Sequence, residues 1–410
     1  MSKTRIITRT VLLISFVSFF NDIASEMLYP VMPVYLRSIG FSILLIGILE
    51  GIAEATAGLS KGYFGNLSDL RRKRLPFIQI GYVLSALSKP LMALFIYPLW
   101  IFFARTLDRL GKGVRTGSRD AILSDETTPE NKGKVFGFHR GMDTLGAAIG
   151  PALALIYLYF FPEQYRWLFF LAFIPGLAAI LLTFFIREKK KIAPVKTPAK
   201  IHFLSYFSYW KRAGSGYRLL AAGMLLFTLF NSSDVFLLLA VKEQGLSDVQ
   251  MIGVYIFFNL IFAAFSYPVG WLADRIGLKT MLIAGLMIFS AVYFGFGWAG
   301  SMWVFGILFF GYGLYAACTD GISKALITNL ADRKDTATAI GLFTSLSSLL
   351  TLLASSMAGF LWFTLGSQWM FIISGIGVGI TVLYFLLTMK RIGSPGSSSQ
   401  GESIETQEIT

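Results

Sequence analysis

Two carboxylic acids, Asp22 and Glu26, lie one helical turn apart inside the first hydrophobic segment of the sequence, within SFFNDIASEMLYPVMPVYL (residues 18–36). A charged side chain at the centre of a lipid bilayer costs at least about 2.5–3.5 kcal/mol on insertion scales, so it faces the inside of a helix bundle. A carboxyl group that lines such an interior can take up and release a proton as its surroundings change. The spacing therefore predicts that Asp22 is a proton carrier and that Glu26 is a second one.

A stripe of basic residues crosses the fourth hydrophobic segment. Its side chains recur at spacings of four, three and seven residues, which places them on one face of a helix; they are Arg105, Arg109, Lys112 and Arg119. Asp108 lies on the same helix and can neutralise the cations three residues before it and four residues after it. Cations of this kind bind carboxylate or phosphate groups, so the stripe either binds an anion or pairs with the acids of other segments.

Further charges in hydrophobic segments are expected to lie near the same interior. In the second segment, Glu50 and Glu54 either line the cavity or pair with the basic stripe. In the second half of the chain the main charged residues are Asp234 and the pair Asp320 and Lys324, whose i,i+4 spacing lets them neutralise each other. This asymmetry predicts that proton coupling resides in the first half and that the second half offers an aromatic, apolar wall.

The composition is that of a membrane protein. Of 410 residues, 55% are hydrophobic and 14% are charged, whereas soluble proteins carry roughly 25% charged residues. The basic residues behind the net charge of +13 lie between hydrophobic runs, which argues against nucleic-acid binding. One cysteine, Cys318, excludes an internal disulfide and a cysteine-based metal site. We find no enzyme motif in the sequence and expect neither a metal nor a cofactor.

Apolar runs long enough to span a bilayer recur about 12 times along the chain, at about 20 residues each. They cover residues 9–36, 42–67, 75–97, 99–123, 135–160, 166–186, 217–241, 249–271, 279–299, 302–325, 337–362 and 369–389. Lys and Arg cluster in alternate loops and near both ends, so the positive-inside rule places both termini in the cytoplasm. The sequence thus predicts an all-α, multi-pass protein of a cell membrane, expected to be a bacterial inner membrane.

One long polar break divides these segments into six and six. It covers residues 187–216, begins REKKKIAPVKTPAK, and predicts a cytoplasmic linker between a bundle at 1–186 and a bundle at 217–390. The remaining residues, 391–410, are rich in Ser, Gly and Glu and are predicted to be a disordered cytoplasmic tail.

The two halves repeat each other at an offset of about 205 residues, which indicates an internal duplication. GNLSDLRRKR (65–74) corresponds to GWLADRIGLK (270–279), and GSRDAILSDETTPENKGKVFG (117–137) corresponds to GISKALITNLADRKDTATAIG (321–341). Two parallel six-helix repeats around a site near the middle of the membrane are the layout of one large transporter class.

With these motifs, residues 1 to about 390 resemble the major facilitator superfamily. The family's loop motif, G-x-L-A-D-R-x-G-R-K, is nearly complete in the second copy, at Gly270, Asp274, Arg275 and Gly277. The first copy has Leu70 at the first arginine position and Arg72 at the second glycine, and it also contains Gly65, Asp69, Lys73 and Arg74. The resemblance implies 12 helices in two pseudo-symmetric six-helix bundles, the MFS fold.

The resemblance also implies roles for particular residues. Asp69 and Asp274 are expected to cap neighbouring helix ends and to latch the outward-open state, with Asp125 as a partner. An antiporter motif, G-x-x-x-G-P-x-x-G-G, is matched in part and favours antiport; the matching residues are Gly146, Gly150 and Pro151. A third family motif, R-x-x-Q-G-x-G, retains its arginine and its last glycine but not its glutamine, which weakens any transfer of mechanism.

Segments one, four, seven and ten line the central cavity of this family. The resemblance therefore predicts that Asp22 faces Arg109 or Lys112 and that Glu26 faces Arg105. A static network of ion pairs that holds the first half together is the structural alternative.

The expected function is secondary active transport of a small organic molecule by alternating access, with proton-coupled export by antiport. Import or exchange of an anionic metabolite is the alternative within the same class. A membrane-embedded lipid-modifying enzyme, for which the cluster His139–Asp143 is the only candidate site, is an alternative of another class. A receptor that does not transport is a further alternative. The expected partners are the substrate, protons and the lipid bilayer, and the chain is expected to act as a monomer.

Overall fold

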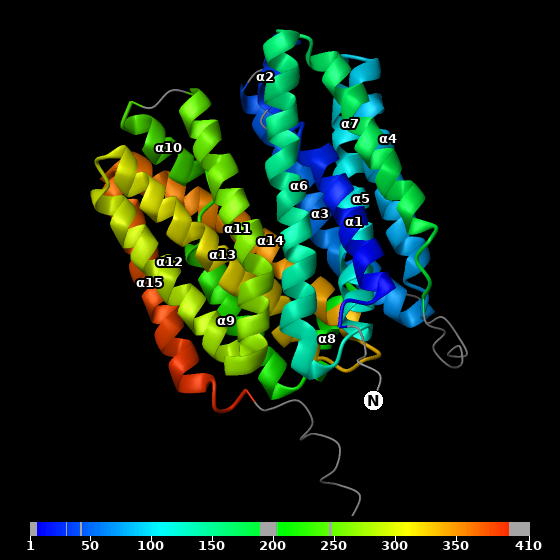
Figure 1. The fold of residues 1–410 in the computed structure, drawn as a ribbon, viewed down its shortest axis with the longest axis vertical. Coiled ribbons are helices and arrows are strands. Elements are labelled where there is room, and N and C mark those ends of the chain that lie inside the picture. The colour runs from blue at the N-terminus through cyan, green and yellow to red at the C-terminus, as the bar shows by residue number, and fades with distance from the viewer. Residues whose placement is uncertain are drawn as a thin grey trace, which may run out of the picture.

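The structure, a computed structural model, describes residues 6–29, 31–41, 43–188, 202, 204–245 and 248–392, and these residues form helices and loops without a strand. Seven helices belong to the first half: α1 (Arg9–Glu26), α2 (Met32–Ser38), α3 (Ile43–Arg71), α4 (Leu75–Leu94), α5 (Pro98–Asp125), α6 (Lys132–Phe160) and α7 (Tyr165–Thr183). Figure 1 shows them on one side of the molecule, in blue to green.

Most of the second half lies on the other side of the molecule (Figure 1). After the short helices η2 (Ser205–Ser208) and α8 (Tyr209–Arg212) come α9 (Ser215–Phe230), α10 (Val235–Glu243), α11 (Asp248–Ile276), α12 (Leu278–Trp298), α13 (Met302–Leu330), α14 (Thr336–Leu365) and α15 (Ser367–Thr388). A further short helix, η1 (Pro129–Asn131), precedes α6. Each predicted hydrophobic segment corresponds to one helix or to two consecutive helices.

Two of the predicted segments are broken near their middle, which hydrophobicity did not indicate. The first is divided into α1 and α2, and Pro33 lies in the first turn of α2, where a fixed φ angle suits a helix start. The seventh is divided into α9 and α10 at residues 231–234, where polar side chains interrupt the apolar run. Broken helices at equivalent places in the two halves are frequent beside the central sites of transporters.

Nine of the helices in the described part of the chain are long and apolar enough to cross a membrane by length and composition alone. The other three predicted spans are the pair α1 and α2, the helix α3 and the helix α5. They do not meet the criterion of apolar composition, and the reason is physical. These helices carry the acids and the basic stripe noted in the sequence, and such charges lower the apolar character of a span while facing the interior of the bundle.

The two halves meet where glycines let helix backbones approach closely. A Cβ atom on Gly65 of α3 would lie 2.4 Å from the carbonyl oxygen of Ala337 of α14. At the equivalent place in the other half, a Cβ atom on Gly270 of α11 would lie 2.3 Å from the carbonyl oxygen of Gly133 of α6. Both contacts lie at the end of the molecule that holds loops 72–74, 126–131 and 331–335, here called the loop-motif end.

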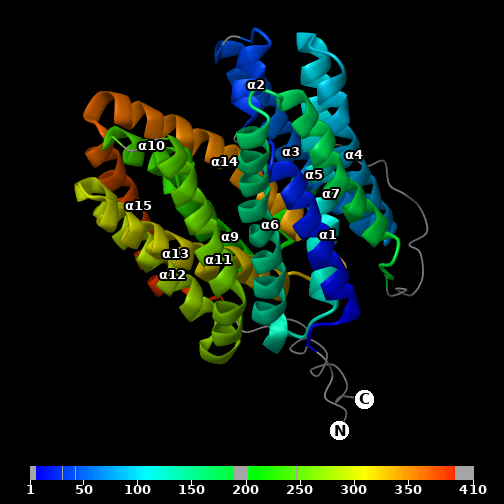
Figure 2. The same ribbon diagram turned by 45° about the horizontal axis from the view of Figure 1, so that its top comes forward.

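Part of the predicted linker also lies at this interface. The ring of Tyr206 lies against Gly62 of α3, and its hydroxyl group forms a hydrogen bond of 3.0 Å with the Ser345 hydroxyl of α14. Figure 2 shows α3 and α14 from a second direction. Residues 189–201 of the linker and residues 393–410 of the predicted tail lie outside the described residues.

Candidate functional site

A charged cavity lies between the two halves of the protein. It contains roughly 1410 Å³ of space not filled by protein atoms, part of it open to solvent. Its acidic residues are Asp22, Glu26, Asp108, Asp143, Asp234 and Asp320. Its basic residues are Lys61, Arg105, Arg109, Lys112, Arg115, Arg119, Arg140 and Lys324. Most of these residues were predicted from their positions in apolar segments, and the fold brings them together.

The two acids of α1 line this cavity beside α6. A Cβ atom on Gly146 of α6 would lie 2.4 Å from the carbonyl oxygen of Phe19 and 3.2 Å from the Cβ atom of Asp22. One turn further along, a Cβ atom on Gly150 would lie 2.7 Å from the backbone nitrogen of Met27. The glycines of the partial antiporter motif therefore allow α1 to approach α6, while Pro151 is buried within α6.

The contacts predicted between α1 and α5 are not formed in this conformation. Among the described residues, neither Asp22 nor Glu26 has a basic nitrogen within ion-pair distance, and Asn21 donates a hydrogen bond of 3.2 Å to Asp22. Arg109 instead lies 3.7 Å from Glu54 of α3, and Arg105 lies 3.5 Å from Asp108 on its own helix.

The packing of the helices explains this difference. Helix α1 packs mainly against α6 and α7, whereas α5 packs mainly against α3 and α4. The sequence left two options open for Glu54, which were to line the cavity or to pair with the basic stripe. In the structure it pairs with Arg109 of that stripe. The side chain of Glu50 lies outside the described side chains.

Lys89 of α4 belongs to this charged region, although the sequence analysis did not single it out. Its side chain is 1% exposed, and its ammonium group donates hydrogen bonds of 2.6 Å to Asp108 and 3.3 Å to Ser25 of α1. Asp108 therefore pairs with Lys89 and Arg105, while the expected contact with Lys112 is not among its ion pairs in the described residues. Lys89 could have been found from the sequence, because it is a charged residue in the middle of an apolar segment. The same criterion had identified Asp22.

A second group of charges joins the two halves. On α6, Arg140 lies 2.5 Å from Asp143 and also pairs with Asp320 of α13. Close by, Lys324 of α13 lies 3.3 Å from Asp120 of α5, a fully buried residue that the sequence analysis passed over. The expected pairing of Asp320 with Lys324 is thus replaced by two ion pairs that cross between the halves.

The residues of one of these pairs are equivalent by internal repeat. In the alignment of GSRDAILSD (117–125) with GISKALITN (321–329), Asp120 occupies the position of Lys324. Equivalent residues of two pseudo-symmetric halves meet only near the axis that relates the halves. The pair therefore lies close to that axis.

The second half contributes aromatic residues to the cavity wall. Asp234, between α9 and α10, accepts a hydrogen bond of 2.7 Å from the Tyr312 hydroxyl. Phe227, Tyr312 and Tyr315 line an adjoining pocket with Asp234. Phe236, by contrast, packs against Trp362 away from the cavity, at a ring separation of 5.7 Å.

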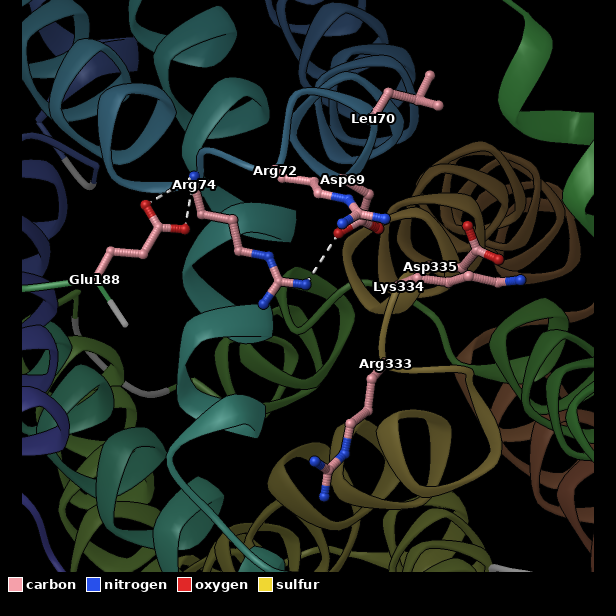
Figure 3. A pocket seen from close by; sticks show the side chains of 8 residues that line it. All are labelled: Asp69, Leu70, Arg72, Arg74, Glu188, Arg333, Lys334 and Asp335. Atoms are coloured by element: carbon pink, nitrogen blue, oxygen red, sulfur yellow. Dashed lines mark hydrogen bonds and ion pairs between the residues drawn. The ribbon is translucent and has the colours of Figure 1, made fainter. Parts of the chain in front are cut away.

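The first loop motif forms a network at the loop-motif end, and Figure 3 shows Asp69, Arg74 and Glu188 of this network. Arg74 lies 3.0 Å from Asp69 and also pairs with Asp125, so Asp125 joins the motif through Arg74. The second carboxylate oxygen of Asp69 accepts hydrogen bonds from the backbone nitrogen and the hydroxyl of Thr338, at 2.7 and 3.0 Å. Glu188, at the start of the linker, accepts from the Arg74 backbone nitrogen at 3.0 Å. The network ties α3 and α5 to the start of α14.

The second loop motif repeats this arrangement in the other half. Asp274 accepts hydrogen bonds from the backbone nitrogens of Gly133 and Lys134, at 2.8 and 3.0 Å, and so caps the start of α6 as a carboxylate does at a helix N-terminus. Arg275 stacks over the ring of Trp271 at 3.6 Å, and Gly277 adopts a φ of +101°, which favours glycine.

The first motif contains two more basic residues. Arg72 and Lys73 are exposed, and Arg72 has a φ of 50° in the turn before α4. In the described residues, no group of three or more His, Cys, Asp or Glu side chains is placed to hold a metal ion.

Comparison with known proteins gives the family. The sequence matches the family model of the Major Facilitator Superfamily over residues 14–265 and 248–407. The chain belongs to this superfamily. An MFS-type transporter of Methanocaldococcus jannaschii is 34% identical over 364 residues, which cover 87% of this chain and 89% of that protein. The multidrug resistance protein MdtH of Photorhabdus laumondii is 25% identical over 307 residues, which cover 73% of each chain.

Solved structures of the superfamily share the fold. The human organic anion transporter MFSD10 superposes with a TM-score of 0.79 at 18% identity, covering 92% of this chain and 99% of that one. The Escherichia coli fucose:proton symporter FucP gives a TM-score of 0.76 at 14% identity, covering 93% and 99%. These comparisons confirm the predicted MFS fold and a multi-pass membrane transporter of small molecules, and they exclude the lipid-modifying enzyme.

Proposed function

We propose that the protein couples transport of a small organic molecule to protons, with Asp22 as the proton carrier and Glu26 as the second, and that it exports its substrate by antiport. One observation supports the proposal that transport is coupled to protons. Both acids line the cavity without a cation at ion-pair distance in the described part of the chain, whereas Asp108, Asp143 and Asp320 each have one. A carboxyl group without a fixed cationic partner is free to exchange a proton or to bind a positively charged substrate.

Alternating access then follows from rocking of the two bundles around the cavity. A proton on Asp22 removes the negative charge that attracts a cationic substrate, so proton and substrate compete for the same acids. Such competition is what exchange across a membrane requires. The similarity to MdtH and the glycines that join α6 to α1 support export as the direction.

The topology belongs to the same proposal. Basic residues concentrated in the loops of the loop-motif end support a cytoplasmic position for that end and for both termini, in a bacterial inner membrane. We take 1–186 and 217–390 as the two bundles of a monomer, 187–216 as the linker and 391–410 as the tail.

A second candidate is transport of an anion, and Lys112 favours it. Its ammonium group lines the cavity, and among the described residues it forms no ion pair. The nearby Lys61 donates a hydrogen bond of 3.2 Å to Ser348 of α14. An anion bound at these lysines would be stabilised by a proton on Asp22 or Glu26, because protonation removes a repelling charge. Proton and anion would then move in the same direction.

The direction of proton movement separates the two candidates. The full-length protein is reconstituted in liposomes with an internal pH reporter, and compounds of either charge are screened for substrate-driven pH change. Antiport predicts that a substrate gradient drives protons the opposite way, and Asp22→Asn abolishes this movement. Proton flux in Asp22→Asn equal to that of the wild type would exclude Asp22 as the carrier.

Lys112→Gln provides the matched test of the second candidate. If the substrate is an anion held at Lys112, this substitution raises its half-saturating concentration by tenfold or more, as expected when a hydrogen-bonded charge worth about 1.5–3 kcal/mol is lost. If the substrate is a cation, removing a repelling charge leaves binding unchanged or strengthens it. Lys242→Gln, on the exposed end of α10, serves as the control.

A further inference from the structure

A chain of charged groups leads from the proton carrier to the contact between the two halves. Asp143 of α6 and Asp22 of α1 line the same cavity, and Asp143 lies one helical turn from Gly146, where a Cβ atom would lie 3.2 Å from the Cβ atom of Asp22. One of the carboxylate oxygens of Asp143 accepts from Arg140 at 2.5 Å, and the other is buried without a hydrogen-bond partner. A contact between two carboxyl groups is a hydrogen bond only when one of them holds a proton. This oxygen lies 3.9 Å from Arg119, beyond hydrogen-bonding distance, and a protonated Asp22 has a hydroxyl group that can donate to it.

The next link crosses between the halves. The guanidinium group of Arg140 binds Asp143 on its own helix and Asp320 on α13 at the same time. Its position is held by the ring of Phe262 of α11, whose centroid lies 5.3 Å away. One cation therefore connects the carboxyl pair beside α1 to the second half.

The charges of this group balance without Asp22. Its acids are Asp120, Asp143 and Asp320, and its cations are Arg119, Arg140 and Lys324. An ionised Asp22 adds an uncompensated negative charge beside Asp143. That charge attracts Arg140 toward α1 and competes with Asp320 for it.

We propose that Asp143 is a positioning residue that links proton occupancy of Asp22 to closure of the loop-motif end. With a proton on Asp22, its hydroxyl group donates to Asp143, and Arg140 stays on Asp320. Loss of the proton draws Arg140 toward α1, releases Asp320 and weakens the contact between the halves. This inference rests on the proposed proton-carrier role of Asp22 and holds for either direction of transport.

Charged and titratable groups surround Asp22 and Asp143 on four helices. They are Asp22 and Glu26 of α1, Lys112 and Arg119 of α5, His139 and Arg140 of α6, and Asp320 and Lys324 of α13. Helix α11 presents the uncharged Phe262 and Asn259, and the one charged residue of α7, Arg166, binds backbone carbonyls at the end of α4. Of the acids in this set, only Asp22 and Glu26 lack a cation at ion-pair distance in the described residues.

Spin labels on the two halves measure the predicted movement. Lys73→Cys and Lys334→Cys place exposed labelling sites on opposite halves of the loop-motif end, near the pocket of Figure 3, in a Cys318→Ser background. In the wild type, the ratio of short to long label distances should fall on the order of tenfold as the pH rises, within the usual range of coupling between sites. Asp22→Asn, which mimics the protonated acid, should keep the short distance at every pH.

Asp143→Asn should also remove the pH response, because the charges then balance with Asp22 ionised. Asp143→Glu should restore it, which separates a positioning effect from misfolding. Glu163→Gln, which removes an exposed acid between α6 and α7, is the control and should titrate like the wild type. A wild-type response in Asp22→Asn or in Asp143→Asn, or no response in the wild type, overturns the inference.

The outcome is independent of the transport assay. Liposomes that show proton-coupled transport, together with label distances that ignore pH, leave the proposed function intact and reject the link through Asp143. If the label distances change with pH and this change is lost in Asp22→Asn, but the protein shows no proton-coupled transport, the link is supported and the proposed function is rejected.

Discussion

Lys89 shows what a single buried charge does in the first half. Its ammonium group is enclosed by Asp108 and Ser25, and the carboxylate of Asp108 has Arg105 as its other cation, at 3.5 Å. Removing one partner of a buried ion pair leaves the other charge without compensation. The side chain therefore connects α4 to α5 and α1 at the level of the cavity.

Lys89→Met should destabilise the protein by about 3 kcal/mol, because it leaves Asp108 buried with a weaker partner. Thermal unfolding of the purified protein in detergent would show this as a lower Tm. Lys73→Met, an exposed lysine of the neighbouring loop, should leave the Tm unchanged. The double variant Lys89→Met with Asp108→Leu should recover part of the loss, and a Tm lower than that of Lys89→Met would contradict the explanation.

At the scale of helices, ion pairs between α5 and α13 and between α6 and α13 hold the first half to the second. Asp120 and Lys324 are both largely buried, and Arg119 supports Asp120 at 2.9 Å from the same helix. Their contact requires α5 and α13 to cross near the axis of the repeat. It therefore depends on how the halves are placed and not only on the helices themselves.

A double-mutant cycle with Asp120→Asn and Lys324→Met should show a coupling energy of about 0.5–3 kcal/mol in stability, the range for residues in one ion-pair network. The measurement is chemical unfolding of both single variants and the double variant. Asp120→Asn combined with Lys279→Met should be additive, since Lys279 binds backbone carbonyls at the end of α15. Additivity in the first cycle would show that the pair is not energetically coupled.

Sequence reasoning found the spans but missed the breaks within two of them. Counting apolar residues treats 9–36 and 217–241 as continuous. In the structure, α1 ends at Glu26 before α2 begins at Met32, and α9 ends at Phe230 before α10 begins at Val235. Partners were harder to predict than positions. Whether Arg105 pairs with Glu26 or with Asp108 depends on which helices pack together, and that information is absent from spacing along one helix. The repeat alignment did hold a usable signal, because it made Asp120 and Lys324 equivalent.

For the whole molecule, equivalent contacts join the two halves at the loop-motif end. Asp69 binds the start of α14, and Asp274 binds the start of α6. Glycines at Gly65 and Gly270 bring the backbones together beside each carboxylate. The same motif therefore joins the two halves on both sides of this end.

Asp69→Ala should shift the population toward a form open at the loop-motif end, because it removes the Arg74 pair and two hydrogen bonds to Thr338. A loss of about 2 kcal/mol corresponds to a change of roughly thirtyfold in the open-to-closed ratio. The rate at which a thiol reagent modifies Lys334→Cys in a Cys318→Ser background reports this opening. Asp332→Ala, exposed in the adjacent loop, is the control, and equal rates in the two variants would argue against a latch at Asp69.

The meeting of Asp120 with Lys324 carries a consequence for the ancestry of the chain. In a homodimeric precursor with two identical halves, this position would have faced its own copy, setting acid against acid or lysine against lysine. Opposite charges became possible there only after the gene had duplicated and its copies had diverged. The modern halves are consequently no longer interchangeable, and a chain assembled from two first halves would bring two aspartates face to face at its centre.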